Sequence, residues 1–189
     1  MELRPPPPII DGTRITLRRH EESLAATMFE YIDRDRERLA RFLPWPPMIQ
    51  SVGDELAYLQ DTLRQWNACT LFDFGIFRKE DALYMGNLGV HTIAWESRCC
   101  ELGYWILGDF EGRGYMGEAI IALESVLFEL GFQCIEIRCD ALNQRSARLP
   151  QRLGFQLEAT LRTELKESPA YRDTMVFTKR RPKDVSLGA

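Results

Sequence analysis

Apolar residues recur along this chain at two spacings, which separate the predicted helices from the predicted strands. Segments 51–66 and 116–130 repeat apolar residues every three or four positions, the spacing of a helix that buries one face. Ser51 is a suitable N-cap for the first helix, and Gly131 is a suitable stop for the second. Three shorter helices are predicted at 21–31, at 34–42, and from the N-cap Asn143 to about Leu153.

Seven other segments have the alternating or continuous apolar character of strands. They lie at 10–19, 69–78, 83–92, 98–107, 134–140, 155–162 and 171–179. This order of strands and helices predicts a mixed α+β fold. The strands before and after helix 116–130 would be parallel neighbours, because a helix crosses between them. The sheet would therefore change character between 105–107 and 135–139, and a ligand can lie there.

Length and composition indicate one globular domain. The 189 residues are interpreted as a single domain with a core of about 10–180, a proline-rich lead-in at 1–9 and a tail at 181–189. Hydrophobic residues make up 45% of the chain and charged residues 28%, as in ordinary globular proteins. The net charge of −4 argues against general nucleic-acid binding.

Cysteine use and hydropathy indicate a cytoplasmic protein without a membrane partner. The chain has no apolar signal region at its start and no apolar run of membrane-spanning length. Its five cysteines are odd in number and form no C-x-x-C pair, and only His20 and His91 accompany them. This pattern argues against a zinc site and favours buried, reduced thiols. Neither histidine is assigned a role.

Three glycines, Gly112, Gly114 and Gly117, lie between a predicted strand and the helix that follows it. Glycines at such a corner allow a tight turn and bring bare N–H groups against a ligand. The helix start adds further N–H donors and the positive end of the helix dipole, so the corner suits a phosphate. An ordinary strand-to-helix turn is the alternative.

The spacing of these glycines also matches the dinucleotide-binding fingerprint, and Asp140 ends the next strand as that fingerprint requires. The motif lies past the middle of the chain, however, and too few elements follow it to build two mononucleotide halves. A nucleoside-triphosphate loop is excluded, because no Lys-Ser or Lys-Thr pair closes the glycine run.

Three separated motifs carry a family resemblance. They are Glu101–Ile106 leading into Glu111–Ala119, Asn143–Ser146 with Arg152–Phe155, and Tyr171–Asp173. Together they resemble the GNAT superfamily of acyl-CoA-dependent N-acetyltransferases, above all its ribosomal-protein (Rim-type) branch, over about residues 10–180. The resemblance implies a mixed, mostly antiparallel sheet of about seven strands with helices on both faces. It also implies a V-shaped splay between the two central parallel strands.

The resemblance implies acetyl-CoA as co-substrate and no metal. The pyrophosphate would rest on backbone N–H groups of 112–117, and the amide of Ile106 or Leu107 would polarise the thioester carbonyl. The residues implied in cofactor binding are Trp105, Ile106, Leu107, Glu111, Gly112, Arg113, Gly114, Tyr115, Met116, Gly117, Asn143 and Ser146. Glu111 and Met116 depart from the usual loop, and the Glu111 side chain is expected to point away from the pyrophosphate. Arg113 either contacts a phosphate or extends into water.

Direct transfer to an amine, without an enzyme nucleophile, is the implied chemistry. By resemblance the Ser146 hydroxyl would donate to the leaving sulfur, although Ser146 can also simply bond back to Asn143. The position matching a catalytic glutamate holds Leu165, and Glu164 precedes it by one residue. Glu164 can act as base only if a bulge or loop turns it inward. Pro150 is predicted to kink its helix and leave the Ser146 carbonyl free.

The implied acceptor is a primary amine, most simply a protein or peptide N-terminus. A small-amine acetyltransferase acting on a polyamine or antibiotic, and a catalytically silent CoA-binding module, are the alternatives. Helices within 21–66 and the loop 166–170 are expected to select the acceptor, with Trp45 either a core anchor or part of the acceptor rim. A monomer and a homodimer are both compatible with the sequence.

Overall fold

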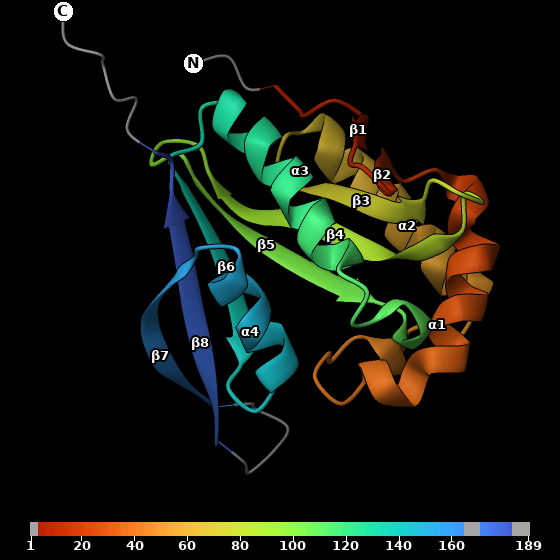
Figure 1. Ribbon diagram of the computed structural model, residues 1–189. Helices are drawn as coiled ribbons and strands as arrows, with labels where there is room; N and C mark the ends of the chain where they lie inside the picture. The colour runs from red at the N-terminus through yellow and green to blue at the C-terminus, as the bar shows by residue number, and fades with distance from the viewer. Residues whose placement is uncertain (1–3, 165–170, 183–189) are drawn as a thin grey trace, which may run out of the picture.

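The computed structural model describes residues 4–164 and 171–182 (Figure 1). At its centre is an eight-stranded sheet with the order β1-β2-β3-β4-β5-β6-β8-β7. Its strands are β1 (Ile9–Asp11), β2 (Ile15–Arg19), β3 (Phe72–Arg78), β4 (Tyr84–Ala94), β5 (Cys99–Ile106), β6 (Cys134–Asp140), β7 (Gln156–Glu164) and β8 (Tyr171–Arg180). All neighbouring strands are antiparallel except β5 and β6. The predicted mixed α+β fold is confirmed.

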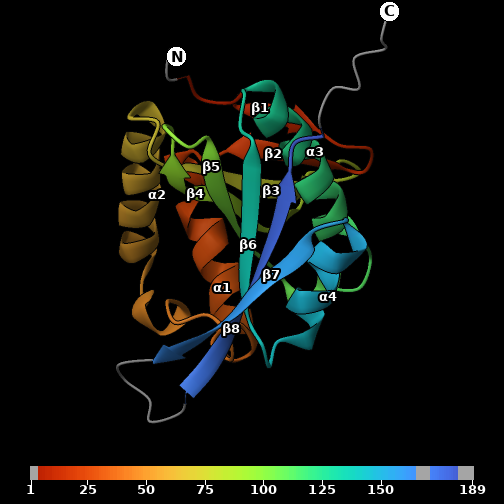
Figure 2. The same cartoon turned by 90° about the vertical axis from the view of Figure 1, so that its left-hand side faces the viewer.

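Helices cover both faces of the sheet (Figures 1 and 2). One face carries α1 (Ala25–Leu39) and α2 (Val52–Asn67), and the other carries α3 (Tyr115–Glu129) and α4 (Gln144–Arg152). Three short 3-10 turns, η1 (Glu22–Leu24), η2 (Pro46–Met48) and η3 (Gly108–Phe110), connect these elements. As predicted, Ser51 caps α2, because its hydroxyl accepts from the Asp54 N–H at 3.2 Å.

Each face of the sheet has its own apolar core. The predicted stripe of α3 is confirmed, since Ile120, Leu123 and Leu127 are fully buried against the sheet. On the opposite face, Ile32 of α1 and Leu59 of α2 lie in a second, smaller cluster. The two cores together hold the strands that border the predicted ligand site.

The first predicted strand is wrong in its extent. Segment 10–19 forms two strands, because the Gly12 N–H donates to the Ile15 carbonyl at 2.9 Å and turns the chain back. β1 therefore pairs with β2 and adds an eighth strand at the edge of the sheet. The sequence carries a sign of this turn, because residues 11–14 are polar or glycine and interrupt the apolar pattern.

The two helices predicted at 21–31 and 34–42 are also wrong, because one continuous helix, α1, replaces them. Arg36 pairs with Asp33 at 2.9 Å, and Arg38 pairs with Asp35, each one turn earlier in the helix. Such pairs stabilise a helix by a few tenths of a kcal/mol each, about 0.2–0.5 kcal/mol. The charged stretch that interrupts the apolar pattern is therefore compatible with an unbroken helix.

The two central strands separate after a short parallel contact. β5 and β6 pair only where Cys99–Leu102 runs beside Cys134–Ile137. Farther along, β5 pairs with β4 alone and β6 pairs with β8 alone, so the two strands diverge (Figure 1). The V-shaped splay that the family resemblance implied is present.

Candidate functional site

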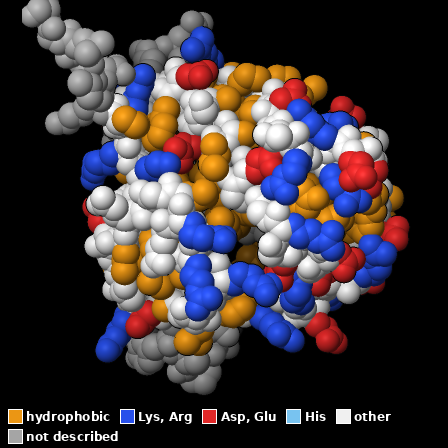
Figure 3. All heavy atoms as spheres, in the orientation of Figure 1, with side chains coloured by type: hydrophobic (Ala, Val, Ile, Leu, Met, Phe, Trp, Pro, Cys, Tyr) orange, Lys and Arg blue, Asp and Glu red, His pale blue; other side chains and the backbone are white. Residues whose placement is uncertain are grey.

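A cleft of about 1390 Å³ enters the splay between β5 and β6 (Figure 3). Its walls are the end of α1 with the residues after it, the second half of β5, the start of α3, the end of β6, and α4. The cleft has two arms, one on the α3/α4 face of the sheet and one on the α1/α2 face. Pockets for one small molecule measure about 300–1,000 Å³. The cleft is larger, and it has room for two substrates.

The start of α3 forms a bare backbone corner in the α3/α4 arm. Gly112 and Gly114 have φ values of 74° and 84°, in the left-handed region that favours glycine. The first helical hydrogen bond of α3 runs from the Glu118 N–H to the Gly114 carbonyl at 3.1 Å. The amides of residues 115–117 precede that bond and point out of the helix start. No atom lies within 4 Å of a Cβ built on Gly112, so the backbone is open to a ligand there.

Arg14, in the turn between β1 and β2, holds this corner from outside the cleft. Its guanidinium donates to the Arg113 carbonyl at 3.2 Å and pairs with Glu118 at 2.9 Å. It also lies 4.8 Å from the centre of the Tyr115 ring. The Arg113 side chain is exposed and does not line the cleft. Of the two interpretations of Arg113, extension into water is the one that this placement favours.

One of the two candidate oxyanion donors is already engaged. The Leu107 N–H donates to the Met85 carbonyl at 2.8 Å, and Leu107 is buried outside the cleft. Hydrogen-bonding direction alternates along an antiparallel strand, so the Ile106 N–H points the other way, toward β6. At that point the splay leaves β5 without a strand partner, and Ile106 lines the cleft. Ile106 is therefore the available donor.

The cleft is positively charged although the whole protein has a net charge of −4. Six arginines and three carboxylates line it. The arginines are Arg38, Arg41, Arg138, Arg145, Arg148 and Arg152. The three on α4 share one helical face, because they are three and four residues apart. Figure 3 shows cationic side chains gathered around the hollow, where their field favours an anionic ligand.

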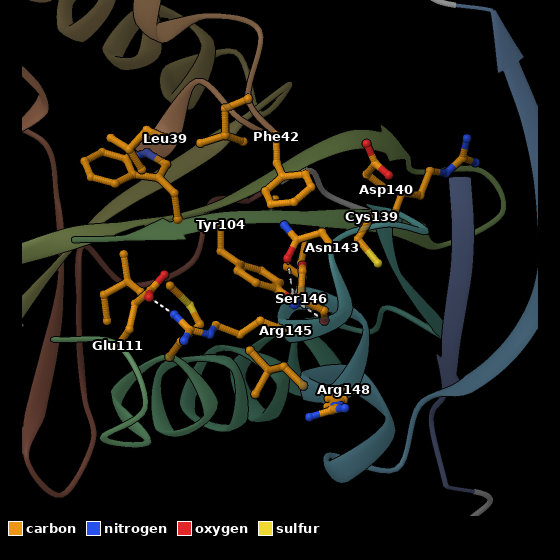
Figure 4. A pocket seen from close by; sticks show the side chains of 18 of the residues that line it. Leu39, Phe42, Tyr104, Glu111, Cys139, Asp140, Asn143, Arg145, Ser146 and Arg148 are labelled. Carbon is orange, nitrogen blue, oxygen red and sulfur yellow. Dashed lines mark hydrogen bonds and ion pairs between the residues drawn. The ribbon is translucent and has the colours of Figure 1, made fainter. Parts of the chain in front are cut away.

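Glu111 lies in the cleft between α1 and α4 (Figure 4). Its carboxylate accepts from Arg38 at 2.6 Å and pairs with Arg145. Arg38 also donates to the Ile106 carbonyl at 2.7 Å. The Glu111 side chain thus lies inside the cleft, and its orientation relative to a bound pyrophosphate stays a prediction. Two arginines neutralise the carboxylate, and this pairing makes it compatible with an anion site.

The start of α4 places Ser146 in the same arm (Figure 4). As predicted, Asn143 caps the helix, since its Oδ1 accepts from the Ser146 N–H at 3.1 Å. The Tyr104 hydroxyl lies 3.4 Å from the Ser146 Oγ and 3.4 Å from the Ser146 carbonyl. The one Tyr104 proton can be donated to either Ser146 oxygen, and Pro150 within α4 has no N–H to donate to the carbonyl. Burial raises the pKa of Tyr104 to about 12, so its hydroxyl keeps its proton at neutral pH.

The α1/α2 arm brings together side chains that are remote in sequence. His91 of β4 faces Glu101 of β5, with 4.0 Å between His91 Nε2 and Glu101 Oε1. Arg138 of β6 lies 3.4 Å from the other oxygen of Glu101. His91 and Glu101 were missed in the sequence, because only the register of β4 against β5 shows that they meet. Phe42, just after α1, lines the opposite wall.

The remaining predicted site residues fall in different places. Trp105 lines the cleft from the α1/α2 face, where its ring lies 5.6 Å from that of Trp45. Trp45 belongs to the smaller core, so it is an anchor of the loop. Met116 and Gly117 line the cleft at the start of α3. Glu164 ends β7, but its side chain and the loop 166–170 lie outside the part of the molecule that the structure describes.

Three further structural findings concern the described ranges 4–164 and 171–182. Within them, no group of three or more His, Cys, Asp or Glu side chains is placed to hold a metal ion. None of the helices there is both long enough and apolar enough to cross a membrane. All five cysteines are free thiols, and burial raises the pKa of Cys100 and Cys139 among them.

Residues 14–156 match the model of the acetyltransferase (GNAT) domain. The ribosomal-protein-serine acetyltransferase of Escherichia coli (strain K12) is 26% identical over 159 residues, which cover 84% of this chain and 88% of that protein. The putative ribosomal N-acetyltransferase YdaF of Bacillus subtilis (strain 168) is 26% identical over 166 residues, covering 87% of this chain and 90% of the relative.

Solved structures share the fold over nearly the whole chain. A RimL ribosomal alpha-N-protein acetyltransferase in complex with coenzyme A has a TM-score of 0.86 at 22% identity, covering 91% of this chain and 97% of its own. The microcin self-immunity acetyltransferase MccE, in complex with acetyl-CoA and AMP, has a TM-score of 0.84 at 20% identity. The match covers 89% of this chain and 93% of the MccE chain. The domain match spans most of the chain, and the relatives and solved structures agree with it. The chain therefore belongs to the GNAT N-acetyltransferases, enzymes that use acetyl-CoA.

Proposed function

We propose that this enzyme transfers the acetyl group of acetyl-CoA directly to the amine of a protein or peptide N-terminus. The observation that carries the proposal is a cleft whose two arms meet where β5 and β6 separate. Two substrates held in the two arms would meet at that point, which replaces an encounter in solution by a fixed approach. The E. coli relative, by its name a ribosomal-protein-serine acetyltransferase, supports a protein acceptor.

The α3/α4 arm fits acetyl-CoA, which supplies the thioester that reacts. A pyrophosphate needs N–H donors and cations, and the backbone of 112–117 and the α4 arginines offer both. The open space beside Gly112 allows close approach of a phosphate to the backbone. The Ile106 N–H would donate to the thioester oxygen, where negative charge grows as the amine attacks.

Ser146 is proposed to assist the leaving group. The Tyr104 hydroxyl keeps its proton and lies 3.4 Å from the Ser146 Oγ, so it can donate to the serine oxygen. The serine proton is then left for the thioester sulfur, whose negative charge increases as the C–S bond breaks. Asn143 supports this arrangement, because its cap fixes the first turn of α4 on which Ser146 lies.

A small-amine acceptor is the second candidate, since the fold neighbour MccE is by its name a microcin self-immunity acetyltransferase. A catalytically silent CoA-binding module is the third, because a fold alone does not establish an activity. These candidates differ in whether acetyl-CoA is consumed and in which amine stimulates its consumption.

The test is an assay of free thiol released from acetyl-CoA, with peptides of different N-terminal residues, polyamines and aminoglycosides as acceptors. Calorimetric titration with CoA accompanies it. Release stimulated by peptides supports the proposal, and release stimulated only by polyamines or aminoglycosides supports the small-amine alternative. CoA binding without stimulated release would indicate the silent module.

A further inference from the structure

The amine that attacks the thioester must first lose a proton, and the proposed function leaves the acceptor of that proton unassigned. One histidine and three carboxylates are found among the lining residues: His91, Glu101, Glu111 and Asp140. Glu111 is neutralised by two arginines in the cofactor arm, as described above. Histidine is the residue type whose ordinary pKa lies between pH 5 and 8, so it can take a proton near neutrality and release it again.

Resting on the proposed transfer to an amine, we propose that His91 accepts the proton of the acceptor amine. Glu101 acts as a positioning residue for the His91 imidazole. Both side chains lie in the α1/α2 arm, on the face of the sheet opposite the glycine corner.

The imidazole lies over β5 in the direction of the thioester site. A Cβ built on Gly103 would be 2.7 Å from His91 Nε2, so the missing side chain of Gly103 is what makes room for the ring. Gly103 and Ile106 are three residues apart on β5, a distance of about 10 Å along a strand.

That distance is comparable with the span of the reacting groups. A hydrogen bond from the Ile106 N–H to the thioester oxygen spans about 2.9 Å. The amine nitrogen approaches the carbonyl carbon to about 3–3.5 Å, and a base reaches the amine proton over about 2.6–3.2 Å. With the carbonyl bond included, these steps sum to about 10 Å, and the direct span is somewhat shorter because the amine attacks the carbonyl obliquely. An amine at the splay can therefore contact the thioester on one side and His91 Nε2 on the other.

Hydrogen bonds around His91 leave Nε2 as the basic nitrogen. The Thr92 hydroxyl lies 3.1 Å from His91 Nδ1 and donates its proton to Glu101 Oε2 at 3.4 Å. Because the Thr92 proton is used in that bond, the Thr92 oxygen must accept a hydrogen bond from His91 Nδ1–H. The lone pair of the neutral imidazole is then on Nε2.

Glu101 lies beside the same nitrogen, with its Oε1 4.0 Å from His91 Nε2. A carboxylate at that distance stabilises the imidazolium that forms when the ring is protonated. The other charged groups that line this arm are Arg138 and Asp140 from β6, Arg38 at the end of α1, and Arg41 from the segment after α1. The His91 side chain is 37% exposed, so an acceptor and water both reach it.

The proton transfers balance as follows. His91 Nε2 takes one proton from the ammonium group and passes it to water. The freed lone pair forms the C–N bond while the C–S bond breaks. The second proton lost by the nitrogen ends on the CoA thiol.

The experiment compares His91→Gln, Glu101→Gln and wild type by the pH dependence of kcat/KM, with a synthetic peptide that begins with serine, with spermidine, and with hydroxylamine. Hydroxylamine is largely unprotonated at neutral pH and needs no base to free its lone pair. For the peptide or spermidine, whichever the wild type acetylates, His91→Gln should lower kcat/KM by about 10²–10⁴-fold at pH 7. With hydroxylamine the loss should be less than tenfold, and CoA binding should be retained.

Glu101→Gln removes the carboxylate that positions the imidazole, so kcat should fall with the peptide or spermidine, by less than in His91→Gln, and stay near the wild-type value with hydroxylamine. Glu96→Gln, a change of the same kind at an exposed position in the turn between β4 and β5 and outside the cleft lining, is the matched control and should behave as wild type.

Three results would overturn the assignment of His91. They are an unchanged profile in His91→Gln, an equal loss with the peptide and with hydroxylamine, and loss of the acid limb in Glu164→Gln while His91→Gln keeps it. The last result would give the role to Glu164. A wild-type protein that acetylates none of the three amines would instead contradict the proposed function on which the assignment rests.

Discussion

The two arms of the cleft are built by different means. The α3/α4 arm takes its donors from consecutive residues of one loop, 111–117, and these donors are backbone N–H groups. The α1/α2 arm is made of side chains, His91, Glu101 and Arg138, which come from three different strands. A backbone site tolerates many side chains, whereas a side-chain site changes with each substitution. Because the backbone donors come from one loop, a single sequence motif predicts the cofactor. The side chains of the other arm come from separate strands, so no sequence motif predicts the acceptor.

The cores beneath the two arms differ as well. Below α3 the sheet is covered by apolar side chains. Below α2 lies a polar network around the buried Asp73, which is 3.1 Å from His20 Nε2 and accepts from the Asn87 amide at 3.3 Å. Glu55 of α2 is buried beside this network. Buried carboxyl groups reduce stability, so the α1/α2 face is expected to contribute less to the stability of the fold than the α3/α4 face.

Among the comparisons of the two arms that follow, the largest expected effect tests the chemistry of the α3/α4 arm. Ser146→Ala should lower kcat by about 100-fold, or about 2.7 kcal/mol, because the leaving sulfur loses its hydrogen-bond donor. CoA affinity, measured by calorimetry, should be retained. Ser125→Ala, on the exposed face of α3, is the matched control. Full turnover by Ser146→Ala would show that this serine only completes the first turn of α4.

The second-largest expected effect tests whether a buried carboxyl group on the α1/α2 face lowers the stability of the fold. Burial raises the pKa of Glu55 to about 7, a rise that His20 reduces and Asp73 increases. An acid whose pKa is raised on folding contributes stability that is present below its ordinary pKa and is lost as pH rises toward 7. When the pH rises from 5 to 8, the free energy of unfolding should therefore fall less in Glu55→Gln than in wild type. The difference between the two decreases should be on the order of 2 kcal/mol.

Urea unfolding at the two pH values measures this difference. Glu37→Gln, an exposed site on α1, is the control and should behave as wild type. The same loss of stability in Glu55→Gln and wild type would mean that Glu55 ionises as readily in the folded protein as in the unfolded chain. The two faces of the sheet would then differ less than the buried network indicates.

A third prediction tests whether the glycine corner is a backbone site. Gly114→Val should weaken CoA binding tenfold or more, at least about 1.4 kcal/mol, because its side chain would stand where a phosphate approaches the backbone. The φ of 84° at Gly114 adds strain of about 1–2 kcal/mol, so the variant should also be less stable. Gly131→Val, at a φ of 99° at the far end of α3, provides matched strain away from the cleft. Equal CoA affinity in the two variants would move the pyrophosphate elsewhere.

The smallest expected effect tests whether the negative charge of Glu111 lowers the affinity of the same arm for CoA. Glu111→Gln removes a carboxylate from the cleft and releases Arg145 to interact with an anionic ligand. CoA affinity should rise by about two- to fivefold, the range of a partly exposed ion pair of about 0.4–1 kcal/mol. Glu129→Gln, an exposed position on α3, makes the same charge change far from the cleft and should have no effect. Weaker binding in Glu111→Gln would show that its contact with Arg38 matters more than its charge.

Local patterns made most of the fold predictable. The stripe of α3, the cap of α2 by Ser51 and the strand Cys134–Asp140 are all encoded by neighbouring residues, and the structure has them where they were expected. The errors at 10–19 and in α1 arise where pairing decides the structure. A hydrogen bond across Gly12 divides the strand, and ion pairs one turn apart join the helix.

The site divides in the same way. Gly112, Gly114 and Asn143 could be found because their roles depend on the backbone next to them. The contact of Glu111 with Arg38 spans 73 residues of sequence, and the meeting of His91 with Glu101 depends on strand register. Neither leaves a periodic signal in the sequence, so neither could be predicted from it.

Arg38 connects the two arms of the cleft through its hydrogen bonds. It lies at the end of α1, in the wall of the α1/α2 arm, yet it donates to the Ile106 carbonyl and to the Glu111 carboxylate of the α3/α4 arm. A ligand that shifted either partner would change the free energy of α1, and occupancy of one arm would then alter affinity in the other. Such coupling is reciprocal by thermodynamic linkage: the factor by which CoA changes the affinity for the amine is also the factor by which the amine changes the affinity for CoA.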